Sequence, residues 1–182
     1  MEDLKPKHDD AAQDKELIAK MLKQHMGDGA SDEEMQAAME AFEYINQLRT
    51  ENGVGTISWN DKIYELARYK AEDMSKRGYF DHVDPDGRCV GNYAHQFGLN
   101  YPADTFADNL FGGGSDMEAV NSWMGSRGHR YNLLFAGHNE GALACYWSKC
   151  VFIGAGGSNW VCDTGEAGLA FWRTVGRQPG ET

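Results

Sequence analysis

The chain has 182 residues, a formal net charge of -11 and 41% hydrophobic residues. This length predicts one compact domain with a short appendage, and the apolar content is large enough for a core, which excludes global disorder. The 28 Asp and Glu residues outnumber the 17 Lys and Arg residues, so the chain lacks the basic excess that phosphate contacts need, and we expect no nucleic-acid partner.

The first quarter of the chain carries most of the acidic excess. Residues 1–51 hold 13 acidic and 6 basic side chains, whereas residues 52–182 hold 15 and 11. Within Asp14–Met26, apolar residues recur at the spacing of an amphipathic helix, which ends at Gly27. We therefore predict an acidic extension with one helix over residues 1–30. No apolar run in the chain approaches the roughly 18 residues needed to span a bilayer, so we expect no membrane span.

The main domain is predicted at residues 31–176 and is followed by a disordered tail at 177–182. Its first helix begins with a capping box, in which Ser31 is followed three residues later by Glu34. The apolar residues that follow share one face of this helix, which is predicted to end at Asn52-Gly53.

Two further helices and a long irregular segment follow. Asn60 caps a helix that ends at Gly78, and Asp116–Ser126 forms another, with acidic residues at its positive end. Between them, residues 79–115 are predicted to be mostly turns and loops, with a short helix at Cys89–Phe97.

After Asn132 the chain changes from helical to extended patterns. Short apolar runs alternate there with Gly-rich turns, which is typical of strands. These runs are Gly141–Lys149, Cys150–Ala155, Trp160–Cys162 and Leu169–Val175. Helices followed by strands predict an α+β fold with an antiparallel sheet.

Two histidines and one aspartate are candidates for chemistry. His82 follows a predicted helix, His129 follows another, and Asp108 lies between them in an apolar stretch. Two imidazoles and a carboxylate could form a metal site with open positions, or an acid/base pair with an orienting carboxylate. The competing interpretation is that each histidine is separately hydrogen-bonded and has no shared role.

Several segments of the chain together resemble one known family. They are Leu48-Arg49-x-x-Asn52-Gly53, Ile57-Ser58-Trp59-Asn60, Phe80-x-His82, Ala107-Asp108-Asn109-Leu110 and Trp123-Met124-x-Ser126-x-Gly128-His129-Arg130-x-Asn132-Leu133-Leu134. In this order they resemble the CAP superfamily, which comprises cysteine-rich secretory proteins, antigen 5 and pathogenesis-related proteins. The resemblance covers roughly residues 38–162, and the last segment is typical of bacterial members.

The resemblance implies a fold and a site. The family fold is a three-layer α-β-α sandwich with a central antiparallel sheet. Family members gather two His and two acidic residues in a surface cleft, and several bind zinc or another divalent ion through the His pair. By resemblance, His82 and His129 are the histidines and metal ligands, Asp108 takes the place of a glutamate, and Asn109 and Asn132 support them.

Three positions depart from the family pattern, and at one of them Ala107 replaces a glycine, which disallows an easy positive φ there. Asp108 is one methylene shorter than the usual glutamate, which puts direct contact with the histidine pair in doubt. Ser126 stands where eukaryotic members carry their second glutamate, so the site holds three of the four residues. Glu140 could supply the missing charge, although we favour its interpretation as a solvated residue that opens a strand.

The four cysteines favour disulfides. Cys145 and Cys150 flank a four-residue loop and could face one another, or Cys162 could bridge to either of them from the next strand. Together with Cys89 they allow three pairings, and the spacing does not choose among them. A secreted family favours oxidised cysteines, while four reduced buried thiols in a cytosolic protein remain the alternative.

The aromatic residues admit two interpretations. Core packing is favoured over the lining of a ligand groove, because these residues fall on predicted strands or on an inward helix face. They are Trp123, Trp147, Trp160, Phe171 and Trp172.

Taken together, the resemblance implies a secreted bacterial protein that acts by binding, without a defined catalytic reaction. We expect a monomer with a small hydrophobic ligand, such as a lipid or sterol, or a protein partner at the histidine cleft, with zinc as a candidate cofactor. Since the first 30 residues lack the apolar core of a signal peptide, the leader is expected to lie outside this sequence. A metal-dependent hydrolase using His82 and His129, with Asp108 orienting water, is the alternative. A third interpretation is a scaffold whose N-terminal helix contacts the partner.

Overall fold

The structure is a computed structural model that describes residues 29–157 and Cys162. The chain divides into two units, Met1–Ala30 and Ser31–Thr182, and almost all described residues belong to the second unit. The helix predicted at Asp14–Met26 and the strands predicted around Trp160 and over Leu169–Val175 lie outside the described residues. Within the described part of the chain, no helix is both long and apolar enough to cross a membrane.

The two long helices begin and end where their caps predict. Helix α2 spans Asp32–Glu51, and the side chain of Ser31 accepts a hydrogen bond from the backbone N–H of Glu34. Helix α3 spans Asp61–Arg77, and Asn60 caps it by accepting from two backbone N–H groups of its first turn. It ends at Gly78, which has the left-handed φ of 68° that glycine adopts without strain.

Four strands form one sheet in the described residues. They are β1 (Ser58–Trp59), β2 (Ala107–Gly112), β3 (Glu140–Tyr146) and β4 (Lys149–Ala155). Their order is β1-β3-β4-β2, with β1 parallel to β3 and both β3 and β2 antiparallel to β4. The β3–β4 hairpin forms the middle of this sheet.

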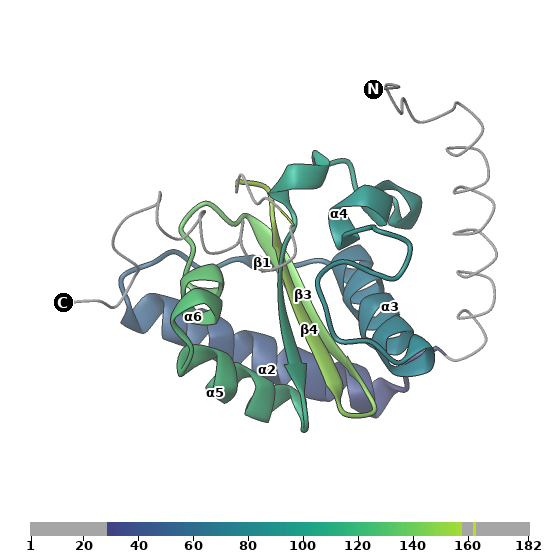
Figure 1. The fold of residues 1–182 in the computed structure, drawn as a ribbon. Coiled ribbons are helices and arrows are strands. Elements are labelled where there is room, and N and C mark those ends of the chain that lie inside the picture. The colour runs from purple at the N-terminus through teal and green to yellow at the C-terminus, as the bar shows by residue number, and fades with distance from the viewer. Residues whose placement is uncertain (1–28, 158–161, 163–182) are drawn as a thin grey trace. The chain divides into compact units, whose positions relative to one another are not determined.

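Helices cover both faces of the sheet, as Figure 1 shows. Helices α2, α5 (Asp116–Met124) and α6 (Arg127–Leu133) lie on one side, and α3 with the short α4 (Val90–Tyr93) lies on the other. The apolar core between the sheet and helices α2, α5 and α6 includes Phe42, Ile45, Trp123, Leu143 and Phe152. This is the expected three-layer sandwich, so the fold prediction is confirmed.

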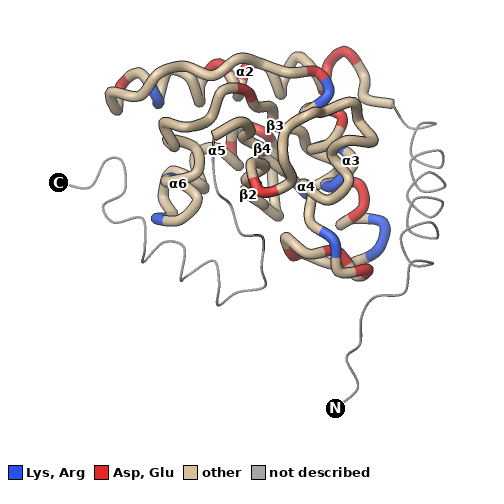
Figure 2. Tube along the Cα trace, turned by 90° about the horizontal axis from the view of Figure 1, so that it is seen from above, with Lys and Arg blue, Asp and Glu red and all other residues tan. Residues whose placement is uncertain are grey.

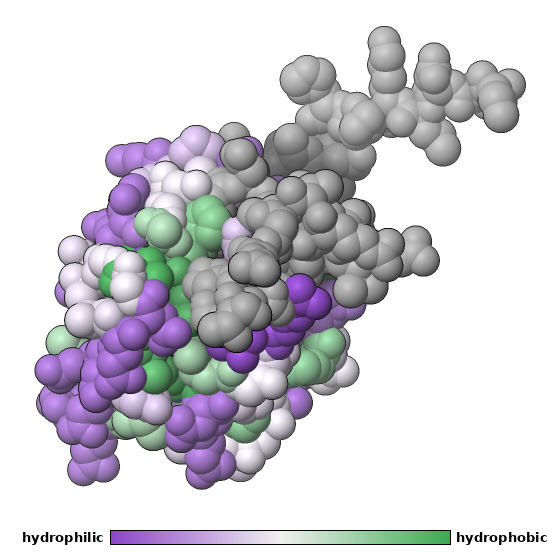
Figure 3. All heavy atoms as spheres, turned by 90° about the vertical axis from the view of Figure 1, so that its left-hand side faces the viewer, coloured by the Kyte–Doolittle hydropathy of each residue, from purple (hydrophilic) through white to green (hydrophobic). Residues whose placement is uncertain are grey.

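Charge and hydropathy are distributed unevenly over the surface. Acidic residues occur along α2 and in the loops, while Lys and Arg are interspersed with them around α3 (Figure 2). On the side shown in Figure 3, apolar residues reach the surface between hydrophilic ones. The most exposed large apolar side chains among the described residues are Met39, Phe80, Met117 and Trp147.

Three local predictions were wrong. Ala107–Gly112, predicted as loop, is strand β2, because pairing along β4 satisfies its backbone groups. Arg127–Leu133, for which no helix was predicted, is α6, which begins after a break at Gly125 and Ser126. Trp147, predicted in the core, is 85% exposed, because it lies in the turn between β3 and β4 and not on either strand.

All four cysteines form disulfides, in one of the three pairings that the sequence left open. Cys145 and Cys150 are direct partners in the β3–β4 register and are bonded to each other, as one alternative predicted. Cys162 bonds to Cys89, at the start of α4, and not to either hairpin cysteine. The pairing depends on a contact across 73 residues, which spacing along the chain does not encode.

Candidate functional site

The site begins with a buried carboxylate on strand β2. Successive side chains of a strand point to opposite faces, so Asp108 faces the α3 side and Asn109 faces α6. The Oδ1 atom of Asp108 lies 3.1 Å from Nδ1 of His82; the Asp108 side chain is 1% exposed and the His82 side chain 29%. The doubt about direct contact was therefore misplaced for His82, because the His82 loop packs close enough to meet the shorter side chain.

This contact controls the charge of His82. The negative charge of Asp108 raises the pKa of His82, against the opposing effect of burial. Asp108 also has a second oxygen, Oδ2, that is buried and has no hydrogen-bond partner among the described residues. A buried carboxylate oxygen without a partner is costly, so a donor supplied by a ligand would be favourable there.

A buried lysine on α3 contacts the loop that carries His82. Lys70 is fully buried, and its Nζ donates to the backbone oxygen of His82 at 3.0 Å and to the hydroxyl of Tyr79 at 3.1 Å. Burial lowers the pKa of Lys70, while the charge of Asp108 counteracts this effect. The sequence analysis did not name Lys70, although a lysine among the buried apolar residues of one helix is itself a signal.

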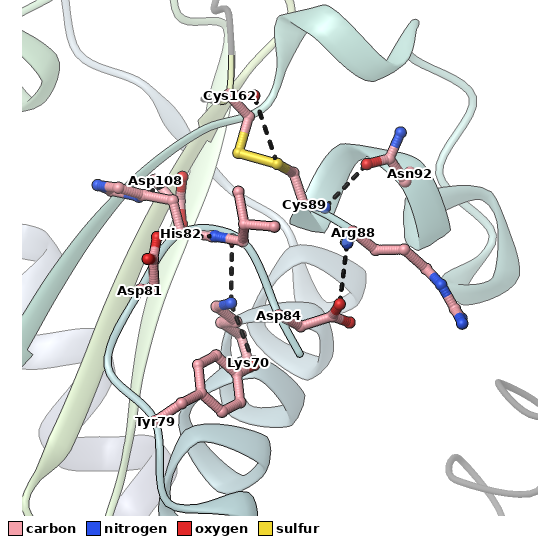
Figure 4. Close-up of a disulfide and its surroundings, with 11 residues drawn as sticks. Lys70, Tyr79, Asp81, His82, Asp84, Arg88, Cys89, Asn92, Asp108 and Cys162 are labelled. Atoms are coloured by element: carbon pink, nitrogen blue, oxygen red, sulfur yellow. Dashed lines mark hydrogen bonds and ion pairs between the residues drawn. A yellow bond between two sulfur atoms is a disulfide. The ribbon is translucent and has the colours of Figure 1, made fainter. Parts of the chain in front are cut away.

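The loop that carries His82 is fixed on both sides. Oδ1 of Asp84 accepts hydrogen bonds from the backbone N–H groups of Asp86 and Arg88, each at 2.9 Å. Directly afterwards, the Cys89–Cys162 disulfide ties the chain to the segment beyond β4. Figure 4 shows His82 beside Asp108, with Lys70 approaching from α3 and the disulfide close to the same loop.

The second histidine reaches the site from the other helical layer. His129 lies in α6, and its Nδ1 is 3.0 Å from the hydroxyl of Ser126, which precedes the helix. Burial lowers the pKa of His129, and the charge of His82 lowers it further, while Asp108 raises it. The charges of His82 and Asp108 thus act on His129, while the side-chain contacts in the structure are two pairs, His82 with Asp108 and His129 with Ser126.

Two asparagines hold α6 against β2. Asn109 donates to the backbone oxygen of His129 at 2.9 Å. Asn132 donates to the backbone oxygen of Ala107 and to Oδ1 of Asn109, each at 3.1 Å. His138, which the sequence analysis did not single out, lies 2.8 Å from Oδ1 of Asn132 through its Nε2. The residues expected to support the site thus position the backbone around His129.

Glu140 has partners outside this site. It opens β3, and its Oε2 accepts hydrogen bonds from the hydroxyl of Tyr101 at 2.6 Å and from the side chain of Asn60 at 3.3 Å. These hydrogen bonds account for a carboxylate at the start of β3. None of them involves a residue of the histidine site.

Each imidazole of the candidate site has a polar partner at its Nδ1 atom. Nδ1 of His82 lies against a carboxylate and Nδ1 of His129 against a hydroxyl, an arrangement typical of metal-binding histidines. Within residues 29–157 and Cys162, no three or more His, Cys, Asp and Glu side chains are grouped to hold a metal ion. Catalytic zinc normally has about three protein ligands, so the described residues do not fit the zinc hydrolase considered as an alternative.

Comparisons with known proteins point to one family. The model of the CAP family, described as the cysteine-rich secretory protein family, matches residues 42–164. The uncharacterized protein YkwD of Bacillus subtilis is 32% identical over 93 residues, which are 50% of this chain and 35% of that protein. The uncharacterized membrane protein YlbC of the same organism is 26% identical over 95 residues, or 51% of this chain and 27% of that protein. The chain therefore spans about a third of the length of these relatives or less.

Solved structures with low sequence identity share the fold. An extracellular protein containing an SCP domain from Bacillus anthracis has a TM-score of 0.63 at 20% identity, covering 70% of this chain and 44% of that chain. An outer surface protein from Borrelia burgdorferi has a TM-score of 0.55 at 17% identity, covering 72% of this chain and 96% of that chain. At these identities the likeness establishes the three-layer architecture.

Proposed function

The chain belongs to the cysteine-rich secretory protein (CAP) family, and on this premise we propose that it is a secreted bacterial protein that acts by binding. Its ligand, a small hydrophobic molecule or a protein partner, contacts the site formed by His82, Asp108 and His129. The observation that carries the proposal is the buried Asp108, which pairs with a partly exposed histidine and keeps one oxygen without a hydrogen-bond partner among the described residues.

Two observations support an extracellular location. Both disulfides connect cysteines that would stay reduced in a typical cytosol. The similar protein from Bacillus anthracis is described as extracellular, and that from Borrelia burgdorferi as an outer surface protein. Each is consistent with a folded domain that works outside the cell.

We include a divalent ion in the proposal as a ligand of the histidine pair. His82 and His129 would hold it through their imidazoles, with Asp108 and Ser126 orienting the rings. When bound, such an ion supplies a Lewis acid that attracts an anionic or carbonyl oxygen of a ligand. Two imidazoles bind more weakly than the four ligands of a structural zinc site, so we expect reversible binding.

Calorimetric titration with zinc chloride tests the ion. We expect measurable heat of binding for the native chain and for His95→Ala, a matched control in which an exposed histidine outside the site is removed. The double variant His82→Ala, His129→Ala is expected to lose the signal. Equal heats for the native chain and the double variant would remove the ion from the proposal.

Binding of an apolar ligand is tested separately with a fluorescent sterol and a dansylated fatty acid. The proposal for a small hydrophobic ligand expects saturable binding of at least one probe, weakened by Asp108→Asn and unchanged by His95→Ala. If neither probe shows saturable binding, the proposed ligand is a protein partner. Pull-down experiments then compare the proteins captured by the native chain with those captured by Asp108→Asn. A set of captured proteins identical for both chains would contradict a binding role of this site.

A further inference from the structure

A groove with a volume of about 530 Å³ is lined by residues other than those of the histidine site. Its walls come from the first turns of α2 and α5 and from the tip of the β3–β4 hairpin. The lining residues are Glu33, Glu34, Ala37, Gly114, Ser115, Asp116, Cys145, Tyr146 and Trp147. None of the residues of the histidine site lines it, so this groove requires its own explanation.

An exposed tryptophan stands at the hairpin end of the groove. Trp147 is 85% exposed and has a left-handed φ of 53°, a conformation uncommon for a bulky residue. The turn is held by the Cys145–Cys150 disulfide and by the hydrogen bond from the N–H of Gly113 to the oxygen of Ser148 at 2.8 Å. The fold therefore presents a large apolar ring to solvent on a rigid turn. Because the turn is already ordered, binding of a partner costs little conformational entropy there.

Neighbouring aromatic rings at this end of the sheet already have cations over them. The guanidinium of Arg68 lies 5.5 Å from the centre of the Tyr146 ring, and Nζ of Lys149 lies 5.0 Å from the centre of the Phe80 ring. Such cations are attracted by the negative face of the ring. Within the described part of the chain, Trp147 has no cation of this kind, although tryptophan is the strongest of the aromatic partners.

The opposite wall of the groove carries carboxylates. Glu34 pairs with Arg68 at 3.4 Å, whereas Glu33 and Asp116 form no ion pair among residues 29–157. Oδ1 of Asp116 is buried and has no hydrogen-bond partner in the same part of the chain. Burial and the negative charge of Glu34 raise the pKa of Asp116, and a cation placed beside Asp116 would counteract both effects. Acidic residues in the first turns of α2 and α5 also stabilise the helix dipoles, but that role leaves Oδ1 of Asp116 unpaired.

We propose that this groove binds a lysine or arginine side chain of a polypeptide partner, with its cation between Trp147 and the carboxylates of Glu33 and Asp116. The ring supplies apolar contact and cation–π attraction, and the carboxylates supply charge complementarity. A groove of this volume accepts one long side chain together with adjacent backbone. This site is separate from the histidine site and does not depend on the function proposed for it.

The probe is a blocked pentapeptide, acetyl-Gly-Lys-Gly-Lys-Gly-amide, titrated into the ¹⁵N-labelled full chain. We expect the indole N–H resonance of Trp147, assigned by its loss in Trp147→Asn, to shift in a saturable manner. Asn suits the left-handed turn position, so this variant preserves the hairpin. From the magnitude of exposed cation–π contacts, Trp147→Asn is expected to weaken binding about fivefold. Glu33→Gln, at an exposed position, and Asp116→Asn are each expected to weaken it as well.

Controls separate this site from general attraction to an acidic protein. Glu65→Gln removes an exposed carboxylate outside the groove, and Met39→Ala removes an exposed apolar side chain on α2. Both variants are expected to bind the peptide like the native chain. The proposal is overturned if the same peptide with acetylated lysines shifts Trp147 equally, or if the groove variants bind no more weakly than the two controls.

Discussion

His138 is a buried histidine that the surrounding residues keep uncharged. It is 4% exposed, and its Nε2 faces both the backbone oxygen and Oδ1 of Asn132, at 3.0 and 2.8 Å, so Nε2 carries the proton. Nδ1 is buried without a hydrogen-bond partner among the described residues. Gly154 allows this packing, because a Cβ there would lie 2.5 Å from the ring. Burial lowers the pKa of His138 to about 3.

This lowered pKa predicts acid sensitivity. An unfolded chain binds a proton at this histidine below a pH of about 6.5, whereas the folded chain binds it only near pH 3, so stability falls as the pH decreases between these values. His138 alone is expected to cost about 2–3 kcal/mol of unfolding free energy between pH 7 and 4.5. Urea unfolding at both pH values, for the native chain and His138→Gln, measures the difference.

The glutamine variant keeps an N–H donor for Asn132 but does not titrate. It is expected to be less stable at pH 7 and to lose less stability on acidification than the native chain. Parallel pH dependence of the two proteins would contradict the assignment of His138 as an uncharged buried group.

At the scale of elements, one arginine joins the ends of two helices. Arg49, near the end of α2, is 1% exposed and donates through Nη1 to the backbone oxygens of Leu133 at 2.7 Å and Phe135 at 3.0 Å. Its Nε donates to the oxygen of Gly55 at 2.7 Å. Burial lowers the pKa of Arg49 to about 10, so it remains charged at neutral pH. The cation thus satisfies carbonyls at the negative end of α6, the helix that carries His129.

Removing this arginine is expected to weaken the attachment of α6. Arg49→Met retains much of the apolar stem but leaves several buried carbonyl groups without donors, and we expect a loss of roughly 3–5 kcal/mol. Chemical unfolding measures it, with Lys62→Met on the exposed face of α3 as the control for loss of a positive charge. A loss below about 1 kcal/mol, as for a surface residue, would show that water or neighbouring groups replace the guanidinium.

At the scale of the whole molecule, the two disulfides constrain very different lengths of chain. Cys145–Cys150 closes a hairpin with a separation of 5 residues, whereas Cys89–Cys162 has a separation of 73 residues. The longer bridge encloses β2, α5, α6 and the β3–β4 hairpin. In the chain-entropy account, a longer closed loop removes more freedom from the unfolded state.

Separate removal of each disulfide distinguishes their contributions. Replacing Cys89 and Cys162 by Ala is expected to cost about 4 kcal/mol, and replacing Cys145 and Cys150 about 2 kcal/mol. Unfolding of both double variants at neutral pH, without reductant, gives the comparison. A larger loss for the hairpin pair would mean that packing around Cys150, and not chain entropy, decides the contribution of each bridge.

Local sequence patterns predicted the elements whose stability depends on near neighbours. Side chains two or three residues away cap α2 and α3, and apolar periodicity identifies their buried faces. The β3–β4 hairpin was also predicted, with its Cys145–Cys150 pairing as one alternative. The first predicted strand continued to Lys149, whereas β3 ends at Tyr146 and Lys149 begins β4. The motifs shared with the family named His82 and Asp108, whose side chains meet in the structure, and Ser126 and His129, which contact each other.

Contacts between distant segments decided the rest, because no local pattern encodes them. Strand β2 is hydrogen-bonded to β4, and Cys162 forms its disulfide with Cys89 across the domain. His82 contacts Asp108 only because the loop after α3 packs over β2. Lys70 and His138 gained their roles in the same way, as buried polar groups whose partners lie on other elements. The sequence by itself determined the family and the boundaries of α2 and α3, and it named the residues of the candidate site. Only the tertiary structure decided which charges lie together, because their interaction depends on distance and burial in space and not on separation along the chain.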